Sequence, residues 1–331
     1  MEKGIYPSVY RRLRSNALVR SLTNPLRLSH HSFILPIFVE EGLSNPRLIE
    51  YMRGTKVENS ESVFSTIDDA MNNGISKFLL FPVPALKTEH PKDFSFASGL
   101  VQTIKSRYGD AIWLASDVCL CSYTTHGHCG IMDDSNRKVL NTESVNVLTL
   151  YALDLASAGV DCIAPSDMMD GRIKSIRQAL DIQGYDETMI MSYSSKFSSQ
   201  WYGPFRDACH SSPVGSALKD RKTYQLSPLN LQAAINCALR DEQEGADILM
   251  VKPAGLYTDV IRSVKSNTHL PLAAYHVSGE YAAIEQMAHL GMIDRAKAHL
   301  EAWSAISRGG ADIIISYAAT DAKAWINSYE Y

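Results

Sequence analysis

The sequence has no long apolar segment and no apolar leader, and each absence excludes a class of protein. The longest apolar runs, such as residues 311–316, are far shorter than the roughly 20 residues that a helix needs to cross a bilayer. The first residues include Glu2 and Lys3 and contain nothing that resembles the apolar core of a secretory signal. We therefore expect a soluble cytoplasmic protein that does not act at a membrane.

Disulfides, excess charge and nucleotide-binding glycines are also scarce. Six cysteines among 331 residues are too few for a disulfide scaffold. A formal net charge of -4 provides no electrostatic footprint for nucleic acid. No Gly-x-Gly-x-x-Gly motif follows the first expected strand, which argues against a dinucleotide-binding open sheet. No Pro/Gly/Ser-rich linker divides the chain after Pro25.

What the chain does have is a regular alternation of short apolar runs and amphipathic segments. We expect helices over residues 60–73 and 142–158. The expected strands cover residues 33–39, 77–83, 111–118, 160–165, 188–193, 247–251, 270–275 and 312–317. Short apolar strands that alternate with helices indicate a parallel sheet covered by helices. Eight such units in about 300 residues predict a (β/α)8 TIM barrel, with a doubly wound open sheet as the alternative.

A small phrase recurs where three helices lead into strands. It reads Ala158-Gly-Val-Asp161, Glu244-Gly-Ala-Asp247 and Gly309-Gly-Ala-Asp312. Glycine adopts the left-handed conformation that ends many helices. The phrase therefore predicts a helix end followed directly by a strand.

Residues 1–31 differ from the rest of the chain because arginines are spaced there among leucines and a valine. We predict an extended N-terminal arm over residues 1–31 that makes oligomer contacts, and a catalytic barrel over residues 32–331. A solvated tail is an equal alternative from the residues alone, and a transit peptide is a third.

Three cysteines gather in the stretch that follows the third expected strand. Cys119 and Cys121 lie two residues apart, so an extended backbone points both side chains to one face. Gly127 and Gly130 allow the turn that brings Cys129 back. Three thiolates predict a metal site, with zinc as the usual ion, and leave one position open for water or substrate. His126 or His128 could instead close the site, and plain packing of the cysteines is a further alternative.

Two lysines follow neighbouring strands at the edge where barrel enzymes place their chemistry. Lys196 follows the fifth expected strand and Lys252 the sixth. Burial and a second nearby cation both lower the pKa of an amine, and a neutral amine attacks a ketone or aldehyde to form a Schiff base. The alternative is that each lysine pairs with a carboxylate such as Asp117, Asp167 or Asp170, or reaches solvent.

A long segment between the two lysines carries Arg206, Arg221 and Gln225. Its glycines, proline and serines predict a mobile loop rather than packed structure. Arginines on a loop above a barrel could clamp a substrate carboxylate, whereas simple solvation is the alternative for each.

Several longer motifs together resemble the porphobilinogen synthase (5-aminolevulinate dehydratase) family over nearly the whole chain, including the arginine-rich arm. These motifs are Ser116-Asp-Val-Cys-Leu-Cys121, His126-Gly-His-Cys-Gly130, Ala164-Pro-Ser-Asp-Met-Met-Asp-Gly-Arg172, Met191-Ser-Tyr-Ser-Ser-Lys196, Tyr202-Gly-Pro-Phe-Arg-Asp-Ala208, Asp220-Arg-Lys-Thr-Tyr-Gln225, Met250-Val-Lys-Pro253, Tyr275-His-Val-Ser-Gly-Glu-Tyr281 and Ser316-Tyr317. The resemblance implies condensation of two 5-aminolevulinate molecules to porphobilinogen with loss of two waters, in tetrapyrrole (haem) biosynthesis.

The resemblance also implies a role for each site residue. Lys252 and Lys196 would form the two Schiff bases, and Asp117 is a candidate for proton transfer. Ser278 and Tyr317 would meet the carboxylate of the first substrate, and Arg206, Arg221 and Gln225 that of the second. Cys119, Cys121 and Cys129 match the zinc ligands of the zinc-dependent members, and the family implies a homo-octamer built from dimers.

Some positions depart from the family pattern. Cys237 stands where members with an allosteric magnesium site carry a glutamate, so this regulation is not expected here. Lys219, Ser227 and Leu229 also differ from the residues usual in the family. These differences concern the dynamics and substrate affinity of the loop that carries Arg221 and Gln225, and not the reaction. Two rival classes remain from the residues alone: a lysine-dependent aldolase needs no metal, and a non-catalytic zinc protein needs no reactive lysine.

Overall fold

Eight parallel strands close into a barrel in the part of the chain that the computed structural model describes, residues 9–328. In order around the barrel the strands are β1 (Phe33–Glu40), β4 (Lys77–Val83), β5 (Trp113–Val118), β8 (Cys162–Pro165), β9 (Met189–Lys196), β10 (Ile248–Lys252), β11 (Leu272–His276) and β12 (Ile313–Ser316). Phe33 of β1 pairs with Ile314 of β12 and closes the ring. The predicted barrel is therefore confirmed, and the open sheet is excluded.

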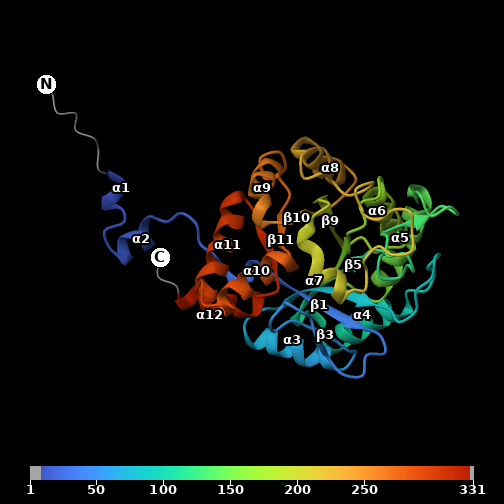
Figure 1. The fold of residues 1–331 in the computed structure, drawn as a ribbon, viewed down its shortest axis with the longest axis horizontal. Coiled ribbons are helices and arrows are strands. Elements are labelled where there is room, and N and C mark those ends of the chain that lie inside the picture. Colours follow the sequence, from blue (N-terminus) through green and yellow to red (C-terminus); the bar gives the residue numbers. More distant parts are fainter. Residues whose placement is uncertain (1–8, 329–331) are drawn as a thin grey trace.

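Helices follow the strands and surround the barrel (Figure 1). They are α3 (Ser62–Asn72), α4 (Ser95–Tyr108), α5 (Asn141–Ser157), α6 (Arg172–Ile182), α8 (Leu231–Gln243), α9 (Thr258–Lys265), α11 (Arg295–Gly309) and α12 (Ala319–Ser328). Shorter additions are α7 (Gly203–Ala208), α10 (Ser278–His289), β2 (Arg47–Leu48), β3 (Lys56–Glu58) and the hairpin of β6 (Ile131–Met132) and β7 (Val139–Leu140). In α3, Val63 and Ile67 are buried on one face, as the helical spacing predicts.

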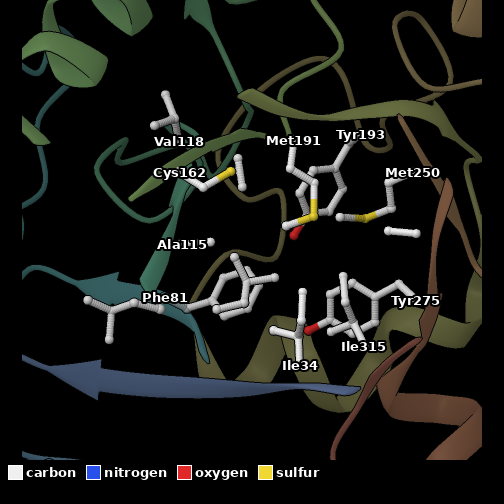
Figure 2. Packing of buried hydrophobic residues seen from close by; sticks show 14 of the residues in the cluster. Ile34, Phe81, Ala115, Val118, Cys162, Met191, Tyr193, Met250, Tyr275 and Ile315 are labelled. Atoms are coloured by element: carbon white, nitrogen blue, oxygen red, sulfur yellow. The ribbon is translucent and has the colours of Figure 1, made fainter. Parts of the chain in front are cut away.

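The barrel interior is filled by side chains that come from every one of its strands. Figure 2 labels several of them: Ile34, Phe81, Ala115, Cys162, Met191, Tyr193, Met250, Tyr275 and Ile315. Strand residues alternate between the interior and the helices, and nearly all of them are buried because both faces of the sheet are covered. Packed interiors of this kind leave the chemistry to the strand ends.

The recurring sequence motif at the helix-to-strand junctions forms hydrogen bonds that connect neighbouring strands. The glycines Gly159, Gly245 and Gly310 have φ of 88°, 102° and 122°, the backbone region that glycine favours. Each following aspartate donates its backbone N–H to a residue of the neighbouring strand and accepts that residue's N–H with its carboxylate. The carboxylate pairs are Asp161 with Leu114 (2.7 Å), Asp247 with Ile190 (2.7 Å) and Asp312 with Leu272 (2.8 Å). The sequence predicts the turns, whereas the aspartate contacts emerge only from the fold.

The N-terminal segment lies outside the barrel. Helices α1 (Val9–Arg12) and α2 (Ala17–Thr23) extend away from the ring of helices in Figure 1. No residue of α2 is buried, and its Leu18 and Leu22 are 83% and 81% exposed. Residues 1–8 of the expected arm fall outside the described residues, and its role in oligomer contacts stays a prediction. Among residues 9–328, no helix is both long and apolar enough to span a membrane.

Candidate active site

Lys196 and Lys252 are the last residues of β9 and β10 and are direct partners across these strands. This pairing depends on an irregularity, because Leu249 is opposite Ser192 whereas Val251 is opposite Ser195. The extra residue on β9 is a bulge, a device that changes where side chains point. Without it, the position opposite Lys252 would fall to Ser195. The bulge also lets β9 continue past Tyr193, where we expected it to end.

Lys252 lies in a cage of aromatic side chains. Its Nζ is 4.0 Å from the ring centre of Tyr275, 4.6 Å from that of Phe205 and 5.0 Å from that of Tyr193. Aromatic faces attract a cation, but the cage also removes water. Burial, followed by the charge of Lys196, lowers the pKa of Lys252 to about 7. A substantial fraction of this lysine is therefore a neutral amine near neutral pH.

Lys196 and Asp117 are two further buried charged residues next to this aromatic cage. Lys196 Nζ donates a hydrogen bond to the backbone oxygen of Ser166 and lies 5.4 Å from the ring centre of Tyr193. Burial raises the pKa of Asp117 to about 6, although Lys196 and then Lys252 favour its ionised form. One Asp117 oxygen, Oδ1, is sealed from solvent without a hydrogen-bond partner. This carboxyl group can gain or lose a proton next to both lysines.

The three cysteines of the loop after β5 meet as the sequence predicts. The sulfur atoms of Cys119, Cys121 and Cys129 all lie within 4.8 Å of one another and are buried. Gly127 allows the turn at φ 70°, where a Cβ would come within 2.5 Å of the Ser212 carbonyl oxygen. Hydrogen bonds from the other two thiols hold the pKa of Cys129 well below its usual range. A compact set of three sulfur ligands fits a zinc ion with one open coordination position.

The two histidines of the loop do not join this cluster. His128 uses both ring nitrogens, since Nδ1 contacts Tyr224 Oη and Nε2 contacts Leu218 O, each at 3.0 Å. His126 accepts the His128 backbone N–H with Nδ1 at 3.1 Å. The set of ligand atoms close enough to share an ion contains only the three sulfurs among the described residues. Closure of the site by a histidine, the alternative from the sequence, finds no support in this geometry.

The segment after Lys196 is packed in part, whereas residues 209–230 form no helix or strand, and its mobility stays a prediction. It contains a 3-10 turn (Gln200–Tyr202) and α7, and both Arg221 and Gln225 are 4% exposed. Arg221 Nη2 donates to the backbone oxygens of Gly127 (2.9 Å) and Ser211 (2.5 Å). These contacts tie the segment to the cysteine loop. Composition alone missed them because the stabilising partners lie far away in the sequence.

Several buried side-chain atoms of this segment have no hydrogen-bond partner in the protein, so they are available to bind a ligand. Neither side-chain atom Oε1 nor Nε2 of Gln225 has a hydrogen bond, and the Nε atoms of Arg206 and Arg221 also have none. Burial and the charge of Arg221 lower the pKa of Arg206. An unpaired buried amide and two close guanidinium groups favour an anion such as a carboxylate.

Ser278 and Tyr317 contact two residues of the aromatic cage around Lys252. Ser278 Oγ accepts the N–H of Phe205 at 3.1 Å, and Phe205 is part of the aromatic cage. Tyr317 Oη is 3.1 Å from Tyr275 Oη. Both predicted residues therefore reach the surroundings of Lys252 through aromatic neighbours.

Glu280, for which no role was predicted from the sequence, lies two residues after Ser278 at the start of α10. Its Oε1 accepts the N–H of Gly255 at 2.8 Å, and its Oε2 accepts that of Val277 at 2.9 Å. One carboxylate thus joins the loop after Lys252 to the residue before Ser278. Burial raises the pKa of Glu280 to about 7, although these backbone N–H groups favour the ionised form.

A buried ion network supports Lys196 from the opposite side. Arg172 is fully buried, and its Nη2 donates to Asp241 Oδ2 at 3.0 Å. The Arg172 Nε lies 3.5 Å from Asp167 Oδ2, and Asp167 follows the Ser166 that binds Lys196. This network, like the aromatic cage, was not predicted, because its members lie far apart in the sequence.

The fold and this site define a (β/α)8-barrel enzyme with two buried lysines and a buried cluster of three cysteines that could hold a metal ion. The family model for delta-aminolevulinic acid dehydratase matches residues 8–325. The Escherichia coli delta-aminolevulinic acid dehydratase is 43% identical over 316 residues, which cover 94% of this chain and 95% of that protein. The Halalkalibacterium halodurans enzyme of the same name is 41% identical over 322 residues, 96% of each chain.

A solved structure agrees with these sequence matches. Delta-aminolevulinic acid dehydratase (porphobilinogen synthase) from Toxoplasma gondii, in complex with the product porphobilinogen, superimposes with a TM-score of 0.91 at 38% identity. The match covers 95% of this chain and 90% of that one. The chain therefore belongs to the delta-aminolevulinic acid dehydratase family, a family of lyase-type dehydratases. The family resemblance inferred from the motifs is confirmed.

Proposed function

We propose that this enzyme condenses two 5-aminolevulinate molecules to porphobilinogen and two waters, through Schiff bases on Lys252 and Lys196. The observation that carries this proposal is the pairing of the two lysines across β9 and β10, next to an aromatic cage and a thiol cluster. A lysine-dependent aldolase would need one such lysine and no sulfur ligands.

The surroundings of each lysine suit a different step. Lys252, with its pKa lowered to about 7, supplies a neutral amine that attacks the ketone of the first substrate with loss of water. Ser278 and Tyr317 are close enough to its cage to bind the carboxylate of that substrate. Lys196 holds the second substrate, and Arg206, Arg221 and Gln225 supply the unpaired donors for its carboxylate.

Asp117 is placed to move protons between the two substrates. Its pKa of about 6 lies near the working range of a general acid or base, and its Oδ1 has no competing partner. Two bound substrates held side by side lose little further entropy when they join. We assign proton transfer to Asp117 on these grounds.

Cys119, Cys121 and Cys129 would hold a zinc ion, and their buried three-sulfur geometry fits it. When bound, the ion supplies Lewis-acid polarisation of a substrate oxygen. The chain's own contribution is to hold the three sulfurs close together, since hydrogen bonds from Cys119 and Cys121, and then the charge of Arg221, favour the ionised form of Cys129.

Assembly and location are part of the same proposal. The exposed leucines of α2 supply an apolar face for contacts in a homo-octamer built from dimers. The substrate and product are small polar molecules, which suits a cytoplasmic enzyme. An allosteric magnesium ion does not fit near Cys237, because burial raises the pKa of this thiol and Arg240 occupies the neighbouring carboxylates.

Pyrrole formation from 5-aminolevulinate tests the proposal. Purified protein is assayed as isolated, after a zinc chelator and after zinc repletion. We expect activity that disappears with the chelator and returns with zinc. Activity that does not change on chelation would support the proposed reaction but show that it needs no metal. A folded, zinc-loaded protein that forms no pyrrole would refute the proposed reaction.

A further inference from the structure

Helix α7 carries two groups of the proposed site within one turn. The ring centre of Phe205 is 4.6 Å from Lys252 Nζ, and the Nε atom of Arg206 has no hydrogen-bond partner. The helix spans only the six residues of Gly203–Ala208, far fewer than an isolated helix needs to be stable in water. Contacts with the barrel therefore decide where Phe205 and Arg206 stand.

The contacts of Phe205 hold one side of α7. Its backbone N–H donates to Ser278 Oγ at 3.1 Å, and its ring centre is 5.5 Å from that of Phe38 and 5.1 Å from that of Phe81. Phe38 belongs to β1 and Phe81 to β4. These contacts fix the side of α7 that covers Lys252, whereas the C-terminal end of the helix needs partners of its own.

His210, two residues after the last residue of α7, holds that end. Its Nε2 lies 3.3 Å from Glu40 Oε2 and 3.4 Å from Arg47 Nη2, and Arg47 Nη2 also donates to Glu40 Oε2 at 2.8 Å. Glu40 is the last residue of β1, and Arg47 is the first residue of β2. Lys87, in the loop after β4, donates from Nζ to the His210 backbone oxygen at 2.5 Å. The side chain and the backbone of His210 thus both join the end of α7 to the barrel.

The side-chain contact of His210 does not depend on which ring nitrogen carries the hydrogen. A hydrogen on Nε2 is donated to Glu40, and a hydrogen on Nδ1 leaves Nε2 free to accept from Arg47. The His210 and Glu40 side chains are 50% and 21% exposed, so solvent weakens the contact. Its loss should therefore shift α7 without unfolding the barrel.

The backbone at His210 turns the chain back onto α7. Its φ is 46°, a left-handed conformation that few residues other than glycine adopt, histidine and asparagine being among the exceptions. Directly after this turn, the Ser211 N–H donates to the Arg206 backbone oxygen at 3.0 Å, and the Ser211 backbone oxygen accepts from Arg221 Nη2 at 2.5 Å. The turn therefore connects the two arginines that are proposed to bind one substrate carboxylate.

We propose that His210 is a positioning residue for the second substrate. With Glu40 it holds the C-terminal end of α7, so that Arg206 and Arg221 stay close enough to bind one carboxylate together. This inference rests on the proposed function, because it takes the role of the two arginines from there. His210 acts through α7 and not on a reacting atom. Glu40 and His210 are 170 residues apart in the sequence, so their pairing could not be predicted from it.

Two substitutions separate the side-chain contact from the backbone turn. Glutamine places an amide nitrogen at about the reach of histidine Nε2 and can still bind Glu40, whereas asparagine suits the left-handed conformation but is too short to reach it. We expect the KM for 5-aminolevulinate to rise about three- to fivefold in a His210→Asn variant, with kcat changed by less than about twofold. A His210→Gln variant should keep a KM close to that of the wild type. Equal KM values in the two variants, or a higher KM in the His210→Gln variant, would overturn the proposal.

A double-mutant cycle tests whether His210 acts through Glu40. The KM is measured in a Glu40→Ala variant, in the His210→Asn variant and in the combined variant. If the two residues form one contact, the combined variant should show no larger rise than the larger of the two single variants. Rises that multiply would refute the pairing. A His269→Ala variant removes another exposed histidine, between α9 and β11, and should keep the wild-type KM.

Amide hydrogen exchange tests the hold on α7 without turnover. The Cys209 N–H donates to the Phe205 backbone oxygen at 3.0 Å, and the Ser211 N–H makes the corresponding bond to Arg206. We expect both N–H groups to exchange faster in the His210→Asn variant than in the wild type and the His210→Gln variant. Unchanged exchange, or faster exchange without a rise in KM, would refute the positioning role. A protein that forms no pyrrole would refute the proposed reaction, whereas the exchange comparison would still test the contact.

Discussion

Lys196 and Lys252 face each other as partners at the ends of β9 and β10, and a bulge in β9 creates this pairing. The arrangement places two cations within reach of one aromatic ring, since the ring centre of Tyr193 is 5.4 Å from one Nζ and 5.0 Å from the other. The charge of Lys196 therefore influences whether Lys252 can act as a neutral amine.

The first prediction concerns the ionisation of Lys252. After burial, the charge of Lys196 is the largest influence that lowers the pKa of Lys252 to about 7. A Lys196→Met variant removes this charge, so the pKa of Lys252 should rise and less neutral amine should be present at pH 7. Borohydride trapping of 5-aminolevulinate on Lys252, followed by mass spectrometry across a pH series, should show a half-maximal pH higher than in the wild type.

An Asp117→Asn variant serves as the control of opposite sign. Asp117 favours the charged form of Lys252, so its neutralisation should move the half-maximal pH of trapping downward. If both variants moved the trapping curve in the same direction, the electrostatic account of Lys252 would be wrong.

The second prediction gives Glu280 a positioning role. Its two oxygens accept N–H groups from the loop after Lys252 and from the residue before Ser278, and a Glu280→Gln variant turns one acceptor into a donor. We expect the KM for 5-aminolevulinate to rise about tenfold, equivalent to about 1.4 kcal/mol, with a smaller change in kcat. The steady-state parameters of the folded variant provide the measurement.

Glu285 on the same helix provides the matched control. It is buried, but it binds Arg295 and His299 rather than the catalytic loops. A Glu285→Gln variant should lose stability and keep its KM. A similar rise in KM in both variants would mean that general loosening of α10 explains the effect of Glu280.

The third prediction is energetic and concerns the buried Arg172. Its removal leaves Asp241 and Asp167 in a buried network without their partner. An Arg172→Ala variant should lose about 3–5 kcal/mol of unfolding free energy, as is typical when one partner of a buried ion pair is removed. Urea unfolding of the wild type and variant gives the value.

The exposed ion pair of Lys222 and Asp220 provides a comparison of the same charge type, with side chains 74% and 50% exposed. A Lys222→Ala variant should lose at most about 1 kcal/mol, because solvent already screens this pair. Equal losses in the two variants would show that burial does not set the strength of the Arg172 network.

The fourth prediction concerns the metal ligands. A Cys121→Ala variant removes one of three sulfurs that lie within 4.8 Å of one another, so it should lose bound zinc and most activity. Metal content measured by elemental analysis on the purified protein decides the outcome. Cys162 is also buried but lies outside the cluster, and a Cys162→Ala variant should keep its zinc. Unchanged metal content in the Cys121 variant would exclude the proposed ligand set.

The sequence predicts the barrel well because its information is local. Apolar runs mark the strands, and Gly159, Gly245 and Gly310 mark the turns before three of them. The cysteine cluster is likewise predictable, since two of its members are two residues apart and a glycine turn returns the third, although Cys121 lies in a turn after β5 and not on an extended segment.

The features that the sequence could not predict all depend on contacts between distant segments. The bulge that pairs Lys196 with Lys252 requires knowledge of the register between two strands. The packing of Arg221 against Gly127 and Ser211 could not be predicted from the composition of its segment, because both partners are distant in the sequence. The Glu280 carboxylate has a visible role only when the loops after β10 and β11 lie side by side.

The central claim is that Lys252 and Lys196 are the residues that bind substrate covalently. Borohydride reduction in the presence of 5-aminolevulinate, followed by peptide mass spectrometry, tests this claim in the wild type and in folded Lys252→Ala and Lys196→Ala variants. We predict label on Lys252 and Lys196 in the wild type, label on Lys252 in the Lys196→Ala variant, and no turnover in either variant. Retained turnover in the Lys252→Ala variant, or label at a lysine other than these two, would contradict the account.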